Sequence, residues 1–304
     1  MPYDVVIVGG GPAGLSAALT LGRARKRVLL CDAGPRRNAA AEHIHGFVTR
    51  DGITPIELRR AGRQQLEAYP NVEVRDVQVA EIRGDRGAFD VRLTIGGVVA
   101  ARRILLGTGM VDELPEIDGF RALWGQSIFI CPYCHGWEVQ DRAFGFLAPD
   151  ADALDFALLL RSWARDVVVL TDGRYAVGPE AQTRLAGAGV RLDERRITRL
   201  CAHEGHLAQV EFTDGRPMPL DVLFARPPQR QVAMVQALGL ALDPAGYVKV
   251  NETTGETSVP GIYAAGDLAT PVQGAILAAA SGMRAAALLN HALTVELATT
   301  AALP

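Results

Sequence analysis

Two cysteines three positions apart, Cys131 and Cys134, carry the most reactive chemistry in this sequence. Such a pair can close into a small disulfide ring and open again. His135 follows the second sulfur, and its imidazole can hold or pass the proton that thiol–disulfide exchange requires. If the pair is redox-active, the rest of the chain must bind a group that supplies or accepts two electrons.

Two other uses of this spacing are less consistent with the sequence. A zinc site needs four ligands, and the remaining cysteines, Cys31 and Cys201, are isolated. Cys-x-x-Cys-His is also the attachment spacing of c-type haem, which normally requires export, and the N-terminal residues show no basic region or small-residue cleavage site. We therefore expect no metal and a redox role for the pair.

The composition limits the class of protein. A chain of 304 residues is too long for one comfortable core and suits two domains. The net charge of −3 argues against nucleic acid as a partner. Four cysteines are too few for a disulfide scaffold, so we expect the cytoplasm. The most apolar helical stretch, 275–289, is interrupted by Arg284 and is too short to span a bilayer, so no membrane partner is expected.

The N-terminus carries a complete dinucleotide-binding pattern. An apolar strand at 4–8 leads into Gly9-x-Gly11-x-x-Gly14, then into a helix, and a second strand ends at Asp32. The glycines allow a tight turn, close backbone approach to a pyrophosphate, and close helix packing. The helix N-terminus then faces the phosphates, and Asp32 can accept hydrogen bonds from ribose hydroxyls. A lone glycine motif is weak evidence, but here its whole context is present in order.

Later segments return the chain towards this site. Further helix or strand patterns cover 55–69, 72–79, 89–93, 103–106, 190–192, 207–212, 221–224 and 232–238. The strand at 103–106 ends in Gly107-Thr108-Gly109, and a strand ending in Gly266-Asp267 precedes a helix from Gln273 onward. A carboxylate beside a second helix N-terminus suggests a long cofactor held at both ends. His43 and His45 could line a substrate pocket, although a structural role is more common for a single histidine.

An internal repeat follows the cysteine pair. Residues 4–34 align with 143–173 at a constant offset without a gap, and the apolar periodicity is preserved. The polar and glycine positions are not: Gly9, Gly11, Gly14 and Asp32 become Ala148, Asp150, Ala153 and Thr171.

These replacements should remove the second nucleotide site. A side chain at position 150 blocks the backbone's approach to a pyrophosphate, and a carboxylate there places negative charge where phosphate charge would lie. Asp150 would itself cap the helix N-terminus. No basic cluster follows the second strand to bind a 2′-phosphate. The repeat therefore predicts a retained fold with doubtful NAD(P)H binding.

Together these motifs resemble the low-molecular-weight thioredoxin-reductase-like flavoproteins over the whole chain. The resemblance implies an α/β fold of two Rossmann-like, three-layer domains, the second inserted into the first. A discontinuous FAD-binding domain would comprise residues 1–112 and 247–304. The insert, 113–246, would be a nucleotide-type domain with a degenerate motif that carries the Cys-x-x-Cys pair. A homodimer is also implied.

The resemblance assigns FAD-binding residues. The ADP part would be held by Gly9, Gly11, Gly14 and Asp32, with Val79 near adenine. Asp267 would bond the ribityl-pyrophosphate region, with Gln273 and Ala275 near the flavin ring. The remaining predicted FAD neighbours are Pro12, Ala13, Ala33, Asn38, Thr108, Gly109, Gly266 and Gly274.

Two departures from thioredoxin reductase set the expected direction of electron flow. The insert lacks the NADPH fingerprint, and the typical Cys-Ala-Thr-Cys-Asp is Cys131-Pro132-Tyr133-Cys134-His135. Both features resemble the FAD-dependent dithiol oxidases that close disulfides in gliotoxin- and holomycin-type natural products and pass electrons to dioxygen. We therefore expect oxidation of a small-molecule dithiol. A substrate thiolate would attack Cys131, Cys134 would face the flavin, and His135 would act as base.

Two other functions remain open at this stage. One is a protein-disulfide reductase that acts on a thioredoxin-like protein and is fed by ferredoxin or by atypical NAD(P)H binding. The other is a flavin-binding sensor without turnover, which the intact Cys-x-x-Cys-His beside both FAD motifs disfavours.

Overall fold

The computed structural model describes residues 1–34 and 37–300, and the chain divides into two compact units. The first unit comprises Met1–Ala39, Phe47–Val111 and Gln229–Pro304. The second comprises Ala40–Gly46 and Asp112–Pro228. The chain passes between the units on either side of Ala40–Gly46 and again on either side of Asp112–Pro228. The second pair of crossings lies at β7 (Val111–Asp112) and β16 (Gln229–Arg230), which pair with each other.

The first unit is built on a seven-stranded sheet in the order β3-β2-β1-β6-β5-β4, with β17 also paired to β6. The strands β3, β2, β1, β6 and β17 run parallel, and β4, β5 and β6 form an antiparallel extension. The strand bounds are β1 Tyr3–Val8, β2 Val28–Cys31, β3 Val72–Arg75, β4 Val79–Asp85, β5 Ala88–Leu93, β6 Val98–Leu106 and β17 Ile262–Ala264. The predicted strand at 72–79 is thus two strands, because the chain turns between Arg75 and Val79.

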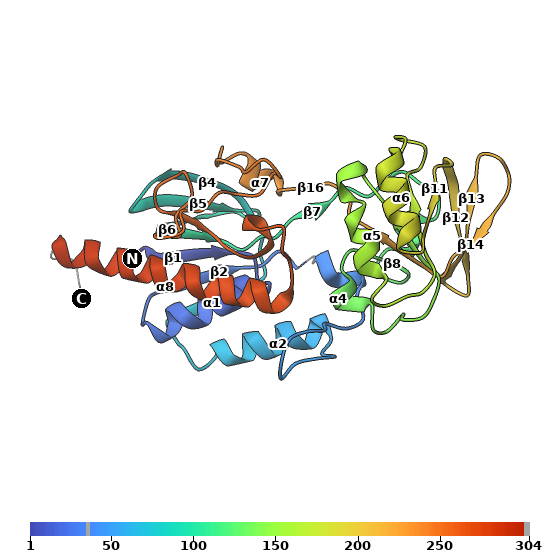
Figure 1. The fold of residues 1–304 in the computed structure, drawn as a ribbon. Helices are drawn as coiled ribbons and strands as arrows, with labels where there is room; N and C mark the ends of the chain where they lie inside the picture. The colour runs from blue at the N-terminus through green and yellow to red at the C-terminus, as the bar shows by residue number, and fades with distance from the viewer. Residues whose placement is uncertain (35–36, 301–304) are drawn as a thin grey trace. The chain divides into compact units, whose positions relative to one another are not determined.

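Helices cover the parallel strands of this unit. Figure 1 shows α1 and α8 side by side along the sheet, with α2 beyond α1. The helix bounds are α1 Pro12–Arg23, η1 Arg37–Ala40, α2 Pro55–Leu66, α7 Ala233–Gln236, η3 Gly266–Ala269 and α8 Ala275–Thr299. Residues 246–250 form an irregular segment with an isolated bridge from Val248 to Leu242.

The second unit repeats the parallel part of this architecture. Its five-stranded sheet has the order β11-β10-β9-β15-β8, beside a three-stranded antiparallel sheet β12-β13-β14. The strand bounds are β8 Ile128–Phe129, β9 Phe144–Leu147, β10 Val167–Leu170, β11 Val190–Asp193, β12 Ile197–His203, β13 His206–Phe212, β14 Met218–Pro219 and β15 Val222–Ala225. The helices are α3 Phe120–Leu123, α4 Pro132–His135, η2 Ala151–Ala153, α5 Asp155–Leu160 and α6 Pro179–Gly187.

The internal repeat is visible in the strand register. In the first unit Val5 pairs with Val28, and in the second Phe144 pairs with Val167. The pairs Val8–Cys31 and Leu147–Leu170 correspond in the same way. The offset predicted from the sequence therefore maps one strand pair onto the other residue for residue. The predicted α/β class with two Rossmann-like halves is confirmed.

The unit boundaries differ from the predicted domain limits in two places. Residues 229–246 lie in the first unit, because Val235 and Leu240 are buried in its core. Ala40–Gly46 lies with the second unit, where Ala40 packs against Gly125 and accepts a hydrogen bond from Gln126.

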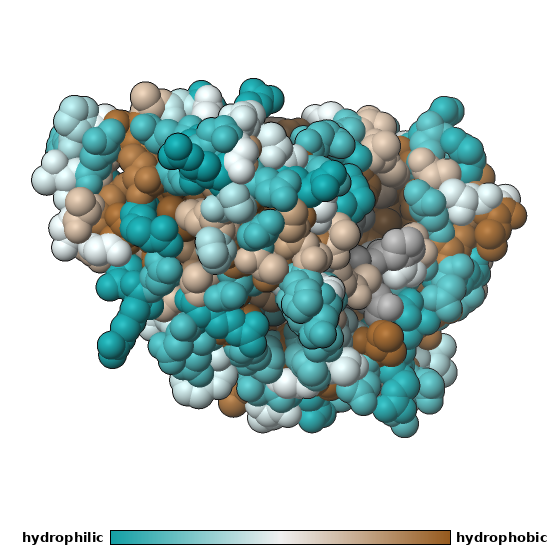
Figure 2. Space-filling view, turned by 90° about the vertical axis from the view of Figure 1, so that its right-hand side faces the viewer, coloured by the Kyte–Doolittle hydropathy of each residue, from teal (hydrophilic) through white to brown (hydrophobic). Residues whose placement is uncertain are grey.

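Helix α8 is longer than the predicted apolar stretch. At 25 residues it is long and apolar enough to cross a membrane by length and composition, so the prediction that this segment is too short is wrong. Its apolar character has a packing explanation, since the small residues Ala278, Gly282 and Ala285 face α1 in a shared core. Side chains on its other faces are exposed, including Ile276, Leu277, Met283 and Val295. The molecular face in Figure 2 is largely hydrophilic and carries several hydrophobic patches.

Gly282 sets how closely α8 approaches α1. A Cβ at Gly282 would lie 2.0 Å from the backbone oxygen of Ala13. Because backbone cannot move aside cheaply, we expect Gly282→Ala to lower the free energy of unfolding by about 1–3 kcal/mol, measured by urea denaturation. Gly187→Ala is the control, since a Cβ there meets nothing within 4 Å at the exposed end of α6. Equal stability of the two variants would contradict this account of helix packing.

Candidate functional site

The turn between β1 and α1 is open at the position where a pyrophosphate would approach. A Cβ added to Gly11 meets no atom within 4 Å, and no side chain caps the N-terminus of α1. The neighbouring glycines are crowded instead: a Cβ on Gly14 would lie 1.8 Å from the backbone oxygen of Gly9. Gly9 itself has φ +108° and packs on Gly107. In the part of the chain that the structure describes, the turn thus presents backbone amides without a side-chain cap, in a space that only glycine leaves empty.

Asp32 lies at the end of β2 and is held by two arginines from α2. Arg59 Nε donates to Asp32 Oδ2 at 2.8 Å, and Arg63 Nη2 lies 3.4 Å from the same oxygen. The carboxylate is nearly buried, and a Cβ on Gly10 would collide with it. Neither arginine was predicted, although their spacing of four on one helix places them on a single face.

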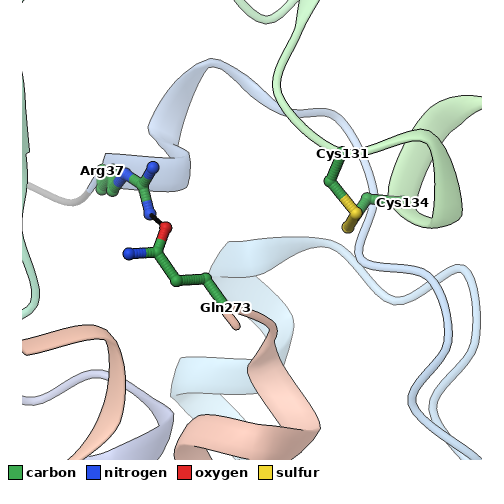
Figure 3. The surroundings of a disulfide bond; sticks show 4 residues. All are labelled: Arg37, Cys131, Cys134 and Gln273. Atoms are coloured by element: carbon green, nitrogen blue, oxygen red, sulfur yellow. Dashed lines mark hydrogen bonds between the residues drawn. A yellow bond between two sulfur atoms is a disulfide. The ribbon is translucent and has the colours of Figure 1, made fainter. Parts of the chain in front are cut away.

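A second polar cluster lies where β17 leads towards α8. Arg37 Nη1 lies 3.1 Å from Asp267 Oδ2 and also donates to Gln273, as Figure 3 shows for the arginine and the glutamine. Gln273 Nε2 donates to Gln229 at 2.8 Å, and the Tyr247 hydroxyl donates to the same oxygen at 3.0 Å. Arg37, Gln229 and Tyr247 were not predicted, because they come from distant segments without a motif.

Close packing joins these parts of the first unit. A Cβ on Gly266 would approach the Ala13 side chain to 3.0 Å, and Gly107 packs on the first turn. The predicted residues Gly9, Ala13, Gly107 and Gly266 are therefore brought together.

Other predicted residues differ in their surroundings. Thr108 and Gly109 are half-buried, Ala33 and Asn38 are exposed, and Gly274 directly precedes α8. The Val79 side chain is buried in the hydrophobic core, so the predicted contact with adenine would have to come from its backbone.

The corresponding turn of the second unit is closed by its own side chains. Asp150 Oδ1 accepts hydrogen bonds from the amides of Asp152 and Ala153, each at 3.0 Å, so the predicted cap is confirmed. The Tyr175 hydroxyl donates to the backbone oxygen of Asp150 at 2.8 Å. Burial, with a smaller contribution from the Asp150 carboxylate, raises the pKa of Tyr175 to about 12, so the phenol keeps its proton. The amides that are open in the first turn are satisfied here.

Cys131 and Cys134 form a disulfide at the start of α4, with the Cα atoms 5.3 Å apart. The short helix begins at Pro132, and both cysteines are half-buried. Figure 3 shows the two sulfur atoms joined beside the helical turn. The predicted redox pair is thus present in its oxidised form, and its Cα separation is within the usual range for a disulfide.

The Cys-x-x-Cys segment carries large aromatic side chains. Tyr133 and Trp137 are 70% and 71% exposed, and Tyr133 meets Trp163 edge to face with the ring centroids 5.3 Å apart. Gly136 lies against Trp163, where a Cβ would come within 2.9 Å of the indole. Large exposed aromatic groups beside a reactive disulfide can contact an apolar substrate.

His135 is packed into the unit rather than presented to solvent. Its ring stacks on Phe129 with the centroids 4.4 Å apart and 12° between the planes. Both ring nitrogens are buried, and neither has a hydrogen-bond partner in the described part of the chain. Burial lowers the pKa of His135, the Glu138 carboxylate opposes that shift, and His45 reinforces it. His135, the predicted base, is therefore a neutral imidazole whose ring nitrogens are shielded from water.

A second histidine lies near the same turn with better access to water. His45 Nε2 is 3.5 Å from Glu138 Oε1, and the two side chains are 21% and 40% exposed. His43 lies beyond it, with the two imidazole centroids 6.1 Å apart. Of the two histidines that the sequence suggested for a pocket, His45 is the one paired to the Cys-x-x-Cys segment.

Comparison with known proteins agrees with this arrangement. Residues 3–292 match the pyridine nucleotide-disulphide oxidoreductase family. The chain belongs to this family. It is therefore an FAD-dependent disulfide oxidoreductase, as the sequence predicted.

Relatives of similar length support the assignment. Thioredoxin reductase sirT of Leptosphaeria maculans is 30% identical over 305 residues, covering 95% of this chain and 93% of that protein. The crystal structure of an oxidoreductase from Agrobacterium tumefaciens has a TM-score of 0.91 and 38% identity, covering 97% of this chain and 99% of that chain. That of HlmI has a TM-score of 0.91 and 36% identity, covering 99% and 95%. The predicted resemblance to thioredoxin-reductase-like flavoproteins is confirmed.

The first turn fits the cofactor that this family implies. FAD carries a pyrophosphate, and the uncapped amides of α1 beside Gly11 provide a place for it. Asp32 would accept the ribose hydroxyls, and Asp267 and Gln273 would lie towards the flavin end.

The open space at Gly11 gives a direct test of this fit. We expect Gly11→Asp to fold normally but to purify without flavin, because the new carboxylate caps α1 and repels phosphate, as Asp150 does in the second unit. Flavin absorbance per protein and the thermal unfolding midpoint of the flavin-free protein report the two effects. Gly187→Ala, in the second unit at the exposed end of α6, should retain flavin. A Gly11→Asp protein with full flavin content would contradict the assignment.

The burial of His135 predicts a pH-dependent stability. Its lowered pKa means that the unfolded chain binds a proton as the pH falls through about 6.5 while the folded protein does not, so stability falls with the pH. His135→Phe removes this effect. From about pH 7.5 to about pH 5.5, the wild-type protein should lose more unfolding free energy than His135→Phe in urea titrations.

His206→Gln, at an exposed position, is the control and should follow the wild type. Parallel pH curves for the wild type and His135→Phe would show that the imidazole is not shielded.

Proposed function

We propose that the protein oxidises small-molecule dithiols to disulfides, passing two electrons through Cys131 and Cys134 to FAD and on to dioxygen. The observation that carries this proposal is the closed second turn. Asp150 occupies the amides that a nicotinamide cofactor's pyrophosphate would need, and Tyr175 is hydrogen-bonded to the same loop. A disulfide oxidoreductase with no ready entry for NAD(P)H must receive electrons elsewhere, and the half-buried disulfide is available.

The exchange between the substrate dithiol and the Cys131–Cys134 disulfide needs no further reagent. A substrate thiolate attacks Cys131 Sγ, the bond between the cysteine sulfurs breaks, and Cys134 Sγ takes the electron pair. The second substrate thiolate then attacks the mixed disulfide, releasing the substrate disulfide and the Cys131 thiolate. Bound FAD supplies a two-electron acceptor that dioxygen can reoxidise, with peroxide as product.

The surroundings of the disulfide are consistent with a small, partly apolar substrate. Tyr133 lies between the two cysteines in the sequence and Trp137 follows Cys134 by three residues, and both side chains are largely exposed. The competing proposal is a thioredoxin-type protein-disulfide reductase, which several relatives' names favour. That activity would need electrons from ferredoxin or from NAD(P)H bound in an atypical way, and the capped turn offers no support for the second source.

A cysteine substitution tests the proposed route. Cys134→Ser should bind FAD normally but lose dithiol-dependent oxygen uptake and peroxide formation, because the disulfide can no longer form. Cys201→Ser, which removes an isolated thiol, should keep both flavin and turnover. Turnover retained in a flavin-loaded Cys134→Ser protein would refute the scheme.

A further inference from the structure

Thiol–disulfide exchange at this site needs a proton acceptor that His135 does not readily provide. The thiolate is the nucleophile, so each substrate thiol must lose its proton before it reacts. A base must then return that proton to water or to a cysteine sulfur. The His135 nitrogens are buried against Phe129 without hydrogen-bond partners in the described residues, so they lack a path for repeated exchange with solvent.

The segment Ala40–Gly46 brings another imidazole to the second unit. It is anchored by Ala40, whose oxygen accepts a hydrogen bond from Gln126 at 3.2 Å, and by Ile44, which is buried. His45 directly follows Ile44, and its Nε2 lies 3.5 Å from Glu138 Oε1. Glu138 follows Cys134 by four residues in the same tightly turned stretch. His45 is therefore fixed beside the reactive segment from outside it.

We propose that His45, positioned by Glu138, accepts the substrate thiol protons during disulfide exchange. The inference rests on the proposed dithiol oxidation. His45 takes the proton from the first substrate thiol, and the resulting thiolate attacks Cys131 Sγ. The second substrate thiol loses its proton in the same way. The two protons end on the cysteine sulfurs or in water, while the substrate is oxidised by two electrons and the enzyme disulfide is reduced.

Exposure and charge support this division of roles. Both members of the pair are partly exposed, so water can reach His45, and the Glu138 carboxylate 3.5 Å from Nε2 holds the imidazole in position. His45 also acts electrostatically on His135, the residue that follows Cys134. The titratable groups around His45 among the described residues are Glu138, His135 and His43.

The test measures disulfide opening directly. Flavin-loaded protein is mixed anaerobically with dithiothreitol, quenched with an alkylating reagent, and the labelled Cys131 and Cys134 are quantified by mass spectrometry; flavin bleaching is recorded in parallel. At neutral pH we expect His45→Gln to open the disulfide about 100-fold more slowly than wild type. Its rate should rise with pH as the dithiothreitol thiolate does, and added imidazole should restore part of it. Glu138→Gln should slow opening about tenfold, as a positioning residue.

His43→Gln is the matched control, because this exposed imidazole lies in the same segment without the Glu138 contact, and it should behave as wild type. Wild-type rate and pH profile in a folded His45→Gln protein, or no effect of Glu138→Gln together with no rescue by imidazole, would overturn the inference. The two readouts separate the hypotheses: a disulfide that opens with dithiothreitol while the flavin stays oxidised would refute the oxidase function, and the variants' opening rates would still decide the role of His45.

Discussion

The unpaired backbone amides at the start of a Rossmann helix are the constraint on which this structure depends. Those groups must be satisfied by a ligand, by water or by a side chain. At the first turn Gly11 leaves them open, and at the second Asp150 takes them. Because the two strand pairs share one register, the same backbone framework gives a nucleotide cradle in one unit and a closed loop in the other. A single side chain changes which molecule the turn can accept.

The closed turn gives the disulfide its place in the proposed electron path. The chain belongs to the pyridine nucleotide-disulphide oxidoreductase family. It has the open first turn that fits FAD and the Cys131–Cys134 disulfide. With the nucleotide entrance capped, the direction that fits the remaining parts runs from substrate thiols to the flavin. The burial of His135 against Phe129 then argues against the role of proton acceptor that the sequence suggested for it.

Much of the fold could be predicted, because it depends on local patterns. The apolar strands, the glycine turn and the repeat specified both Rossmann halves, and the cap by Asp150 followed from one side chain. What could not be predicted depends on contacts between distant segments. Arg59 and Arg63 reach Asp32, Arg37 reaches Asp267, and Ala40–Gly46 packs with the second unit, none of which has a sequence motif. The shielding of His135 by Phe129 is likewise a packing result that spacing alone does not reveal.

The central claim is that electrons do not enter through a nicotinamide cofactor. Its most direct test is to mix the oxidised, flavin-loaded protein with NADPH, and separately with NADH, in an anaerobic stopped-flow instrument. The account predicts that the flavin stays oxidised over the period in which a dithiol bleaches it. Rapid bleaching by either nucleotide would show that the turn capped by Asp150 is not a barrier and would contradict the account.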